Sequence, residues 1–160
     1  GSTHKLQALL GGQTVLVRTL ATVQASGLPW HLEQQGLPGM GDSIAAGVRA
    51  TPDASGWLIL PADLPLVKAS TLRAIAAPSA MAVTVPVHEG QRGHPVRFGA
   101  VCGASLMQLE GSKGAASVLQ AQMAKGSVAL MDVEDAGVVT DIDTLDDLQR
   151  AEVLLRQRAS

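Results

Sequence analysis

The sequence predicts an α/β domain with a mainly parallel β-sheet. Apolar segments of strand length alternate along the chain with segments whose apolar residues recur at helical spacing. Residues 56–62 (GWLILPA) form a continuous apolar run, which is typical of a central parallel strand covered on both faces. The 160 residues fit one domain, and 46% hydrophobic against 16% charged residues supply one large core. We therefore expect a single domain over residues 1–160, with helices on both sides of the sheet.

The expected helices follow from apolar periodicity and from residues that begin or end helices. They cover residues 13–26, 42–51, 68–77, 103–111, 114–126 and 143–160. Gly27 and Gly126 follow two of these segments, where a glycine commonly ends a helix. The side chains expected to cap helix N-termini are Asp42 or Ser43, Ser70, and Asp143 or Thr144. Asp146 and Asp147 would then lie in the first turn of the last helix, where the dipole favours acidic residues.

The expected strands are the shorter apolar runs between these helices. They cover residues 28–35, 56–62, 81–87, 94–102 and 127–133. The first of them alternates only weakly, and the fourth has mixed polarity. The remaining three are strongly apolar, which favours strands inside a covered sheet.

Composition argues against several classes of protein. Aromatic residues make up only 2%, which argues against a platform for stacking nucleic-acid bases, and the net charge of -2 argues against a basic DNA-binding face. The sequence shows no apolar run of membrane-spanning length and no signal peptide. Cys102 is the single cysteine, which excludes an internal disulfide and fits a reducing compartment. We expect a cytoplasmic protein without nucleic-acid or membrane partners, in which Cys102 is a small buried hydrophobic residue.

Asp63 is the first candidate for a functional side chain. It follows the apolar run 56–62 directly, and ligands of parallel sheets bind beyond the carboxyl ends of the strands. Pro61 and Pro65 restrict the backbone around it. A carboxylate in this place can cap a helix, pair with a cation, or hold Mg²⁺ against a phosphate.

Asp141 and Asp143 form a second acidic segment, just before the last predicted helix. If the segment is extended, their side chains point to the same face. The simpler interpretation is that Asp143 or Thr144 only caps the helix, although Asp143 can also serve as a ligand.

Two further segments have the composition of ligand-binding loops. Residues 36–47 (GLPGMGDSIAAG) lead a glycine-rich loop into a helix, whose first amides can bind an anion or a base edge, although a plain structural turn is equally consistent. Residues 89–98 (EGQRGHPVRF) place Arg92, Gly93, His94 and Pro95 after a predicted strand, which favours contact with an anionic substrate. No cysteine, histidine or glutamate lies at zinc-ligand spacing from His94, and the chain has no GxSxG elbow of a hydrolase.

Taken together, several segments carry a resemblance to a known family. They are HKL, LLGGQTVL, GMGDSIAAGV, GWLILPADLPLV, GQRGHPVRF, GAASVL and VVTDIDTLDDL. In this order the chain resembles the nucleotidyltransferases of molybdenum-cofactor maturation, and in particular their cytidylyltransferase branch. The resemblance covers nearly the whole chain and implies a Rossmann-like three-layer fold of the nucleotide-diphospho-sugar transferase type.

The resemblance also implies an activity and a set of site residues. The implied reaction transfers CMP from CTP, with Mg²⁺, to the terminal phosphate of a molybdopterin-type cofactor and releases pyrophosphate. A molybdenum hydroxylase would be the recipient of the product. By position, Asp63 and Asp143 would ligate Mg²⁺, and Lys5 would contact the triphosphate, so that Lys5 and Asp63 are the expected catalytic residues. The residues expected at the nucleotide base are Gly41, Asp42 and Ser43, and those expected at the acceptor are Arg92, Gly93, His94 and Pro95.

The chain also departs from the family pattern. The family begins with a strand and a glycine-rich phosphate loop, and the given sequence starts just after them. Either this segment precedes Gly1 outside the given sequence, which we expect, or the protein lacks the loop. Ser112 and Ala116 stand where family members often have Asp and Arg. The alternatives are a transferase that uses GTP, one that acts on a sugar or alcohol phosphate, and a non-catalytic protein that binds or delivers the molybdenum cofactor.

Overall fold

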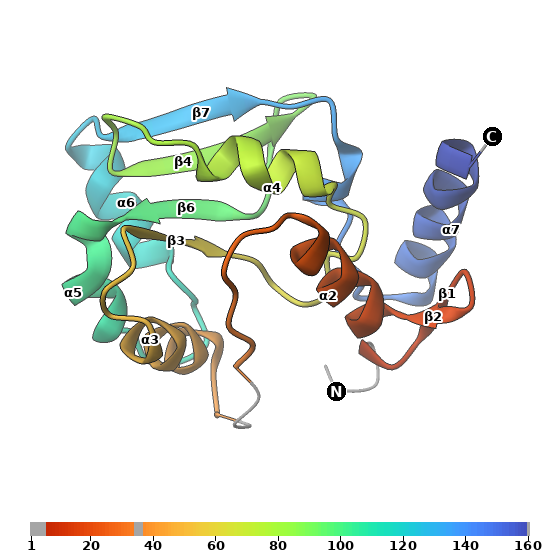
Figure 1. Cartoon of the computed structure of the whole chain (residues 1–160), viewed down its shortest axis with the longest axis horizontal. Coiled ribbons are helices and arrows are strands. Elements are labelled where there is room, and N and C mark those ends of the chain that lie inside the picture. Colours follow the sequence, from red (N-terminus) through yellow and green to blue (C-terminus); the bar gives the residue numbers. More distant parts are fainter. Residues whose placement is uncertain (1–5, 34–36, 160) are drawn as a thin grey trace.

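The computed structural model describes residues 6–33 and 37–159 (Figure 1). The helices are α2 (Val15–Ala25), α3 (Met40–Ala50), α4 (Ala69–Ala76), α5 (Gly103–Met107), α6 (Ala116–Ala124) and α7 (Leu145–Ala159). The strands are β1 (Leu9–Leu10), β2 (Gln13–Thr14), β3 (Gly56–Ile59), β4 (Val83–His88), β5 (Gln91–Arg92), β6 (Val96–Gly99) and β7 (Val128–Asp132). Two 3-10 turns, η1 (Ala100–Cys102) and η2 (Ala136–Val139), complete these elements.

The central sheet contains β3, β6, β4 and β7 side by side, and β5 pairs with the carboxyl end of β4. β4 and β7 are parallel, whereas β6 runs antiparallel to both β3 and β4. As a result β3, β4 and β7 all point in one direction, and their carboxyl ends lie at the same edge of the sheet. The predicted α/β class with a mainly parallel sheet is therefore confirmed, with β5 and β6 as the strands of opposite direction.

Helices cover both faces of this sheet, as predicted. Figure 1 shows α4 in front of β4 and β6, and α6 behind them. Alternate residues of one strand enter different cores, since Trp57 and Ile59 pack on the side of α3, α5 and α6, whereas Leu58 packs on the side of α2 and α4. The α3-side core contains Ile44, Val48, Val83, Val85, Val96, Phe98, Cys102, Leu106 and Val118. The α4-side core contains Leu64, Val67, Leu72 and Val138.

Helix α7 packs away from the sheet, against the β1–β2 hairpin (Figure 1). A third core joins them, formed by Leu10, Val15, Leu66, Ile142 and Ala151. This core holds the two segments that carry the candidate acidic residues. Leu66 lies three residues after Asp63, and Ile142 lies between Asp141 and Asp143.

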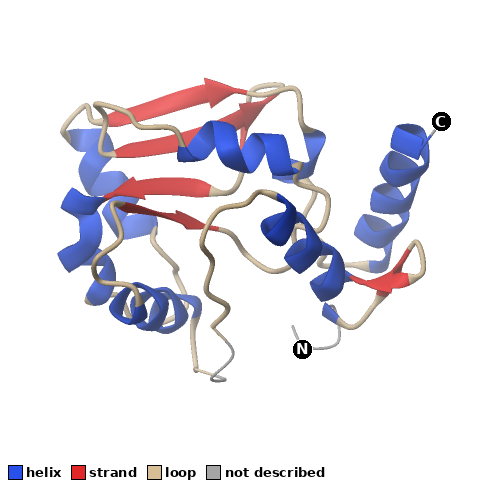
Figure 2. Ribbon diagram, viewed as in Figure 1, coloured by secondary structure: helices blue, strands red, loops and turns tan. Residues whose placement is uncertain are grey.

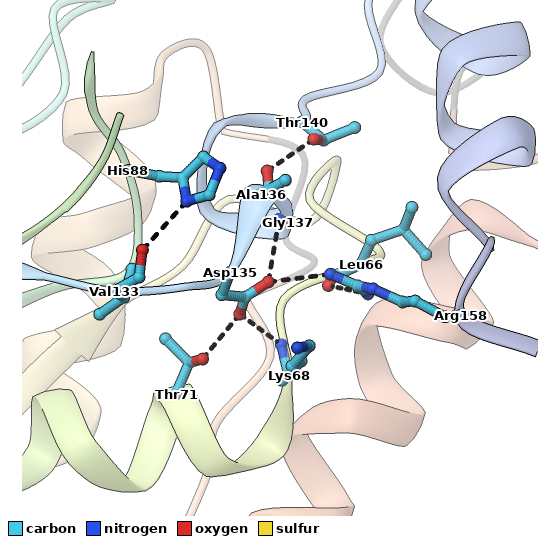
Figure 3. A network of polar contacts seen from close by, with 10 residues as sticks. All are labelled: Leu66, Lys68, Thr71, His88, Val133, Asp135, Ala136, Gly137, Thr140 and Arg158. Atoms are coloured by element: carbon cyan, nitrogen blue, oxygen red, sulfur yellow. Dashed lines mark hydrogen bonds and ion pairs between the residues drawn. The ribbon is translucent and has the colours of Figure 1, made fainter. Parts of the chain in front are cut away.

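Asp135 holds α7, α4 and η2 together from inside the protein (Figure 3). Its side chain is 2% exposed. Its Oδ2 accepts hydrogen bonds from Lys68 N at 2.9 Å and Thr71 Oγ1 at 2.7 Å, and its Oδ1 accepts from Gly137 N at 2.9 Å. Arg158 near the end of α7 donates to the same Oδ1 at 3.0 Å and to Leu66 O at 2.7 Å. Asp135 therefore binds the residues at the start of α4 from a distant part of the chain. The predicted cap, Ser70, is wrong because α4 begins at Ala69 with Lys68 as its N-cap.

Two strand predictions are also wrong. Residues 28–33 lie in the loop between α2 and α3, not in a strand (Figure 2). β3 is not central, since it ends the strand order in the described part of the chain and all four of its residues are half-buried. The apolar run of β3 indicates that helices cover both faces of the strand. It does not indicate whether other strands lie on both of its edges, and this is why the prediction of a central strand failed.

A search of the described helices for a membrane span found none of sufficient length and apolar character.

Candidate active site

Asp63 lies in the loop that follows β3, at the carboxyl edge of the sheet, as predicted. Its side chain is half-buried. The backbone on either side of it is fixed from two directions: Thr19 Oγ1 of α2 donates to Ala62 O at 2.7 Å, and Ile142 N donates to Asp63 O at 2.9 Å. The second of these bonds brings the segment 141–143 next to Asp63.

Asp63, Asp141 and Asp143 form one acidic cluster. One carboxylate oxygen of each lies within 4.8 Å of those of the other two, and Asp141 and Asp143 are exposed to solvent. The structure therefore brings together the two expected metal ligands, Asp63 and Asp143. It adds Asp141, which the ligand assignment from the sequence omitted although its alternation with Asp143 was the available signal.

The carboxylates of this cluster perturb one another. The pKa of Asp141 is raised, first by loss of water around it, then by a side-chain hydrogen bond with Asp143 and by the negative charges of Asp143 and Asp147. Three carboxylates offer only hard oxygen donors when ionised, which is the donor set that Mg²⁺ and Mn²⁺ prefer. The cluster can thus hold a divalent cation.

The start of α7 shows which residue caps this helix. Thr144 Oγ1 accepts from Asp147 N at 3.1 Å, and Asp147 Oδ2 accepts from Asp143 N at 3.0 Å and Thr144 N at 3.1 Å. This is a reciprocal capping box, and the hydrogen bond from the Asp143 amide is the main cause that lowers the pKa of Asp147. Thr144 is therefore the cap, and the Asp143 carboxylate faces the acidic cluster instead.

A cavity of about 180 Å³ opens beside the carboxyl end of β3. Its walls come from β3, β6, the first turns of α3 and α6, and the loop before β6: Met40, Ile44, Ile59, Pro61, His94, Val96, Phe98, Ala115, Ala116 and Leu119. His94 is the one polar side chain among them. His94 keeps part of its surface exposed, and burial of the rest of the side chain lowers the pKa of the imidazole. Since Pro61 lines the cavity and Asp63 follows two residues later, the cavity and the acidic cluster share one edge of the sheet.

The residues next to His94, namely Arg92, Gly93 and Pro95, have different environments. Gly93 N donates to Pro86 O at 2.9 Å, and a Cβ on Gly93 would lie 2.1 Å from Val138 O, so only glycine fits there. His94 N donates to Val138 O at 2.9 Å, and the His94–Pro95 peptide bond is cis. Arg92 is exposed, with Nη1 3.5 Å from Met123 Sδ of α6. Gly93 and Pro95 are thus buried framework, and of this segment His94 alone lines the cavity.

The glycine-rich loop has a structural explanation. Gly41 N donates to Gly111 O at 2.8 Å, and Asp42 Oδ2 accepts from Gly111 N at 3.1 Å. A Cβ on Gly39 would lie 2.2 Å from Gly111 O, so the glycines permit close approach of the 110–111 loop. The helix begins at Met40 with Gly39 as its N-cap, so the predicted caps Asp42 and Ser43 are wrong.

Two of the expected base-binding residues, Asp42 and Ser43, have surroundings of their own at the start of α3. Asp42 lines a second, open cavity of about 380 Å³ with Leu37, Ala46, Arg49, Gln108, Leu109 and Glu110. Ser43 Oγ is 3.3 Å from Gly39 O within the first turn of the helix. Lys5, the expected triphosphate contact, lies outside the described residues.

A three-layer α/β fold with acidic side chains at the carboxyl edge of its sheet is an arrangement that nucleotide-handling enzymes use. The chain belongs to the MobA-like NTP transferase domain family, whose model matches residues 18–127. It is therefore a nucleotidyltransferase, as the resemblance implied. None of the curated proteins matches the chain.

Solved structures share this fold. Rv0371c from Mycobacterium tuberculosis, in complex with manganese, has a TM-score of 0.77 at 23% identity, over 94% of this chain and 92% of that one. Molybdopterin-guanine dinucleotide biosynthesis protein A from Archaeoglobus fulgidus has a TM-score of 0.64 at 16% identity, over 96% and 91%. The 2-C-methyl-D-erythritol 4-phosphate cytidylyltransferase from Thermus thermophilus has a TM-score of 0.65 at 22% identity, over 95% and 93%.

Proposed function

We propose that this protein transfers CMP from CTP to the terminal phosphate of a molybdopterin-type cofactor, in a Mg²⁺-dependent reaction that releases pyrophosphate. The observation that carries the proposal is the acidic cluster of Asp63, Asp141 and Asp143 beside an apolar cavity at one edge of the sheet. The family match supports the nucleotidyl transfer, and the fold shared with a cytidylyltransferase and with a molybdopterin-guanine dinucleotide biosynthesis protein supports the choice of substrates.

In this proposal the acidic cluster holds the cation. Asp63 and Asp143 are its ligands, and Asp141 supplies a third oxygen from the same face. The manganese complex of Rv0371c, a protein of the same fold, supports a divalent cation. When bound, Mg²⁺ offsets the negative charge of the α-phosphate and of the departing pyrophosphate. Hydrogen bonds to the carbonyls of Ala62 and Asp63 keep the Asp63 carboxylate in place for this task.

The cavity next to the cluster receives the acceptor. Its apolar walls and volume of about 180 Å³ suit a flat ring system, and the His94 imidazole offers one hydrogen-bonding edge to it. If the acceptor phosphate extends from the cavity past Pro61, it would lie near a cation bound by Asp63. The phosphate is already an oxyanion, so orientation and charge neutralisation suffice and the transfer needs no strong general base.

The remaining expected contacts belong to the same proposal. Arg92 would attract the anionic acceptor, and Gly93 and Pro95 would hold the His94 backbone in place. Gly41, Asp42 and Ser43 would lie at the nucleotide base, and Lys5 at the triphosphate. We further propose that the protein acts in the cytoplasm and passes its product to a molybdenum hydroxylase.

Pyrophosphate release tests this function directly. The full-length protein is incubated with Mg²⁺, the molybdopterin-type cofactor and either CTP or GTP, with Asp63→Asn as the matched control. We expect release with CTP, strong dependence on the acceptor, and none above background from the control. A preference for GTP would mean that GTP, not CTP, is the substrate. Pyrophosphate release only with a sugar or alcohol phosphate would mean that the acceptor is not a molybdopterin-type cofactor. No release with any pair of substrates would reject the enzymatic assignment.

A further inference from the structure

Thr19 connects helix α2 to the loop that carries Asp63. The side chain lies inside α2 and is only 4% exposed. Its Oγ1 is 3.0 Å from Val15 O in the preceding turn and 2.7 Å from Ala62 O, 43 residues along the chain. A hydroxyl has a single proton, and the shorter distance points to Ala62 O as its acceptor. The buried hydroxyl thus binds the peptide group immediately before Asp63.

The hydrogen bond from Thr19 to Ala62 O restricts the backbone at Asp63. The Ala62 carbonyl belongs to the peptide plane that ends at the Asp63 nitrogen, so its orientation sets one of the two backbone directions at Asp63. Ile142 N fixes the other side by donating to Asp63 O at 2.9 Å. Without the Thr19 hydroxyl, the peptide between Ala62 and Asp63 can rotate while the bond to Ile142 remains.

We propose that Thr19 is a positioning residue for the metal site: its hydroxyl orients the Ala62–Asp63 peptide and thereby directs the Asp63 carboxylate toward Asp141 and Asp143. The inference rests on the proposed role of Asp63 as a cation ligand. Groups behind metal ligands that fix their orientation commonly change metal affinity by about 10- to 100-fold when removed. Thr19 acts through the backbone rather than through the carboxylate, so we expect the lower end of this range.

The test is Mn²⁺ binding to the whole protein, measured by isothermal titration calorimetry and by the EPR signal of free Mn²⁺. Thr19→Val keeps the shape of the side chain and removes the hydroxyl, whereas Thr19→Ser keeps the hydroxyl. Thr71→Val is the matched control, because Thr71 is also buried in a helix and its hydroxyl donates over a long sequence separation, to Asp135. All measurements are made at a temperature where circular dichroism shows each variant folded.

We expect Thr19→Val to raise the Kd for Mn²⁺ by about tenfold. Thr19→Ser should stay within about twofold of the wild type, and Thr71→Val should lose thermal stability without losing Mn²⁺ affinity. Wild-type affinity in Thr19→Val, or an equal loss in Thr71→Val, would overturn the positioning role. If the valine variant does not fold, Thr19→Ala removes the same hydroxyl and carries the same expectation.

Failure of the underlying metal site gives a different result. In that case Asp63→Asn binds Mn²⁺ as tightly as the wild type, and the inference about Thr19 falls with the site. Loss of binding in Asp63→Asn together with unchanged binding in Thr19→Val rejects only the role of Thr19.

Discussion

Asp135 and the acidic cluster of Asp63, Asp141 and Asp143 show two opposite uses of carboxylates in the same protein. Asp135 is a single buried carboxylate with hydrogen bonds from Lys68 N, Thr71 Oγ1, Gly137 N and Arg158 (Figure 3). The cluster instead places three carboxylates within 4.8 Å of one another at the edge of the sheet. In the first arrangement four donors surround one carboxylate, whereas the second brings three carboxylates together where a cation can bind them.

Structural and functional acidic residues differ in what surrounds the carboxylate. A buried carboxylate is stable when donors surround it, and its removal leaves those donors without an acceptor. Carboxylates that approach one another weaken the folded protein unless a ligand joins them. Mutations in the two groups should therefore separate activity from stability.

The largest expected effect is on activity, from Asp63→Asn in the acidic cluster. The change keeps the size of the side chain and removes a charged cation ligand. We expect kcat/KM to fall by about a thousandfold, equivalent to about 4 kcal/mol of transition-state stabilisation, with little change in the unfolding midpoint. Pyrophosphate release and urea denaturation measure the two quantities. Near-wild-type turnover in this variant would remove Asp63 from the site.

The next effect is on stability, from Asp135→Ala. The substitution leaves two backbone amides, the Thr71 hydroxyl and the Arg158 guanidinium without their acceptor. We expect the free energy of unfolding to fall by about 3 kcal/mol, because breaking a buried ion pair from one side is strongly destabilising. Mn²⁺ affinity of the folded protein should be unchanged. Weaker Mn²⁺ binding in the folded variant would mean that the two carboxylate groups are coupled.

A smaller loss of stability is expected from Arg158→Lys. Arg158 binds Leu66 O and Asp135 Oδ1 with two different guanidinium nitrogens, which a lysine cannot reproduce with its single amine. We expect a loss of about 1 kcal/mol in urea denaturation. Arg156→Lys is the control, because Arg156 is an exposed residue in the same last turn of α7. Equal losses in the two variants would show that the effect comes from the helix terminus rather than from the bond to Asp135.

Local features of the chain could be predicted from the sequence, and contacts between distant residues could not. Periodicity located β4, β7 and most helices, because their burial patterns are local properties of the chain. The apolar run before Asp63 placed this residue at the carboxyl edge of the sheet. Asp143 was expected as its partner only from the family resemblance, because the hydrogen bond from Ile142 N to Asp63 O that joins the two segments is not a local property of the chain. Asp135 and Thr19 gave no signal, since their partners lie 64 and 43 residues away and only the folded chain brings them into contact. The prediction of a Ser70 cap failed because α4 begins one residue earlier, after Lys68, whose amide is bound by Asp135 from another element.

The smallest expected effect comes from Asp141→Asn, which tests whether crowding in the cluster weakens the metal-free protein. Burial and the bond to Asp143 raise the pKa of Asp141 in the folded state above its ordinary value of 3.8. The folded protein therefore holds this proton at pH values where the unfolded chain has released it. By linkage, the contribution of Asp141 to stability falls as the pH rises from about 3.8 through the raised pKa, and the full penalty persists at neutral pH.

Asparagine cannot ionise and can still donate a hydrogen bond to Asp143, so it escapes this penalty. With EDTA present, we expect Asp141→Asn to be more stable than the wild type at pH 7 by less than about 1 kcal/mol, since solvent screens the exposed side chain. The difference should shrink as the pH falls to 3.8 and vanish well below it, because Asp141 is then protonated in both states. Saturating Mn²⁺ should reverse the order at pH 7, because the wild type gains a ligand that the variant lacks. A variant that is less stable than the wild type in EDTA would show that Asp141 belongs with Asp135, as a structural carboxylate, rather than with the cation site.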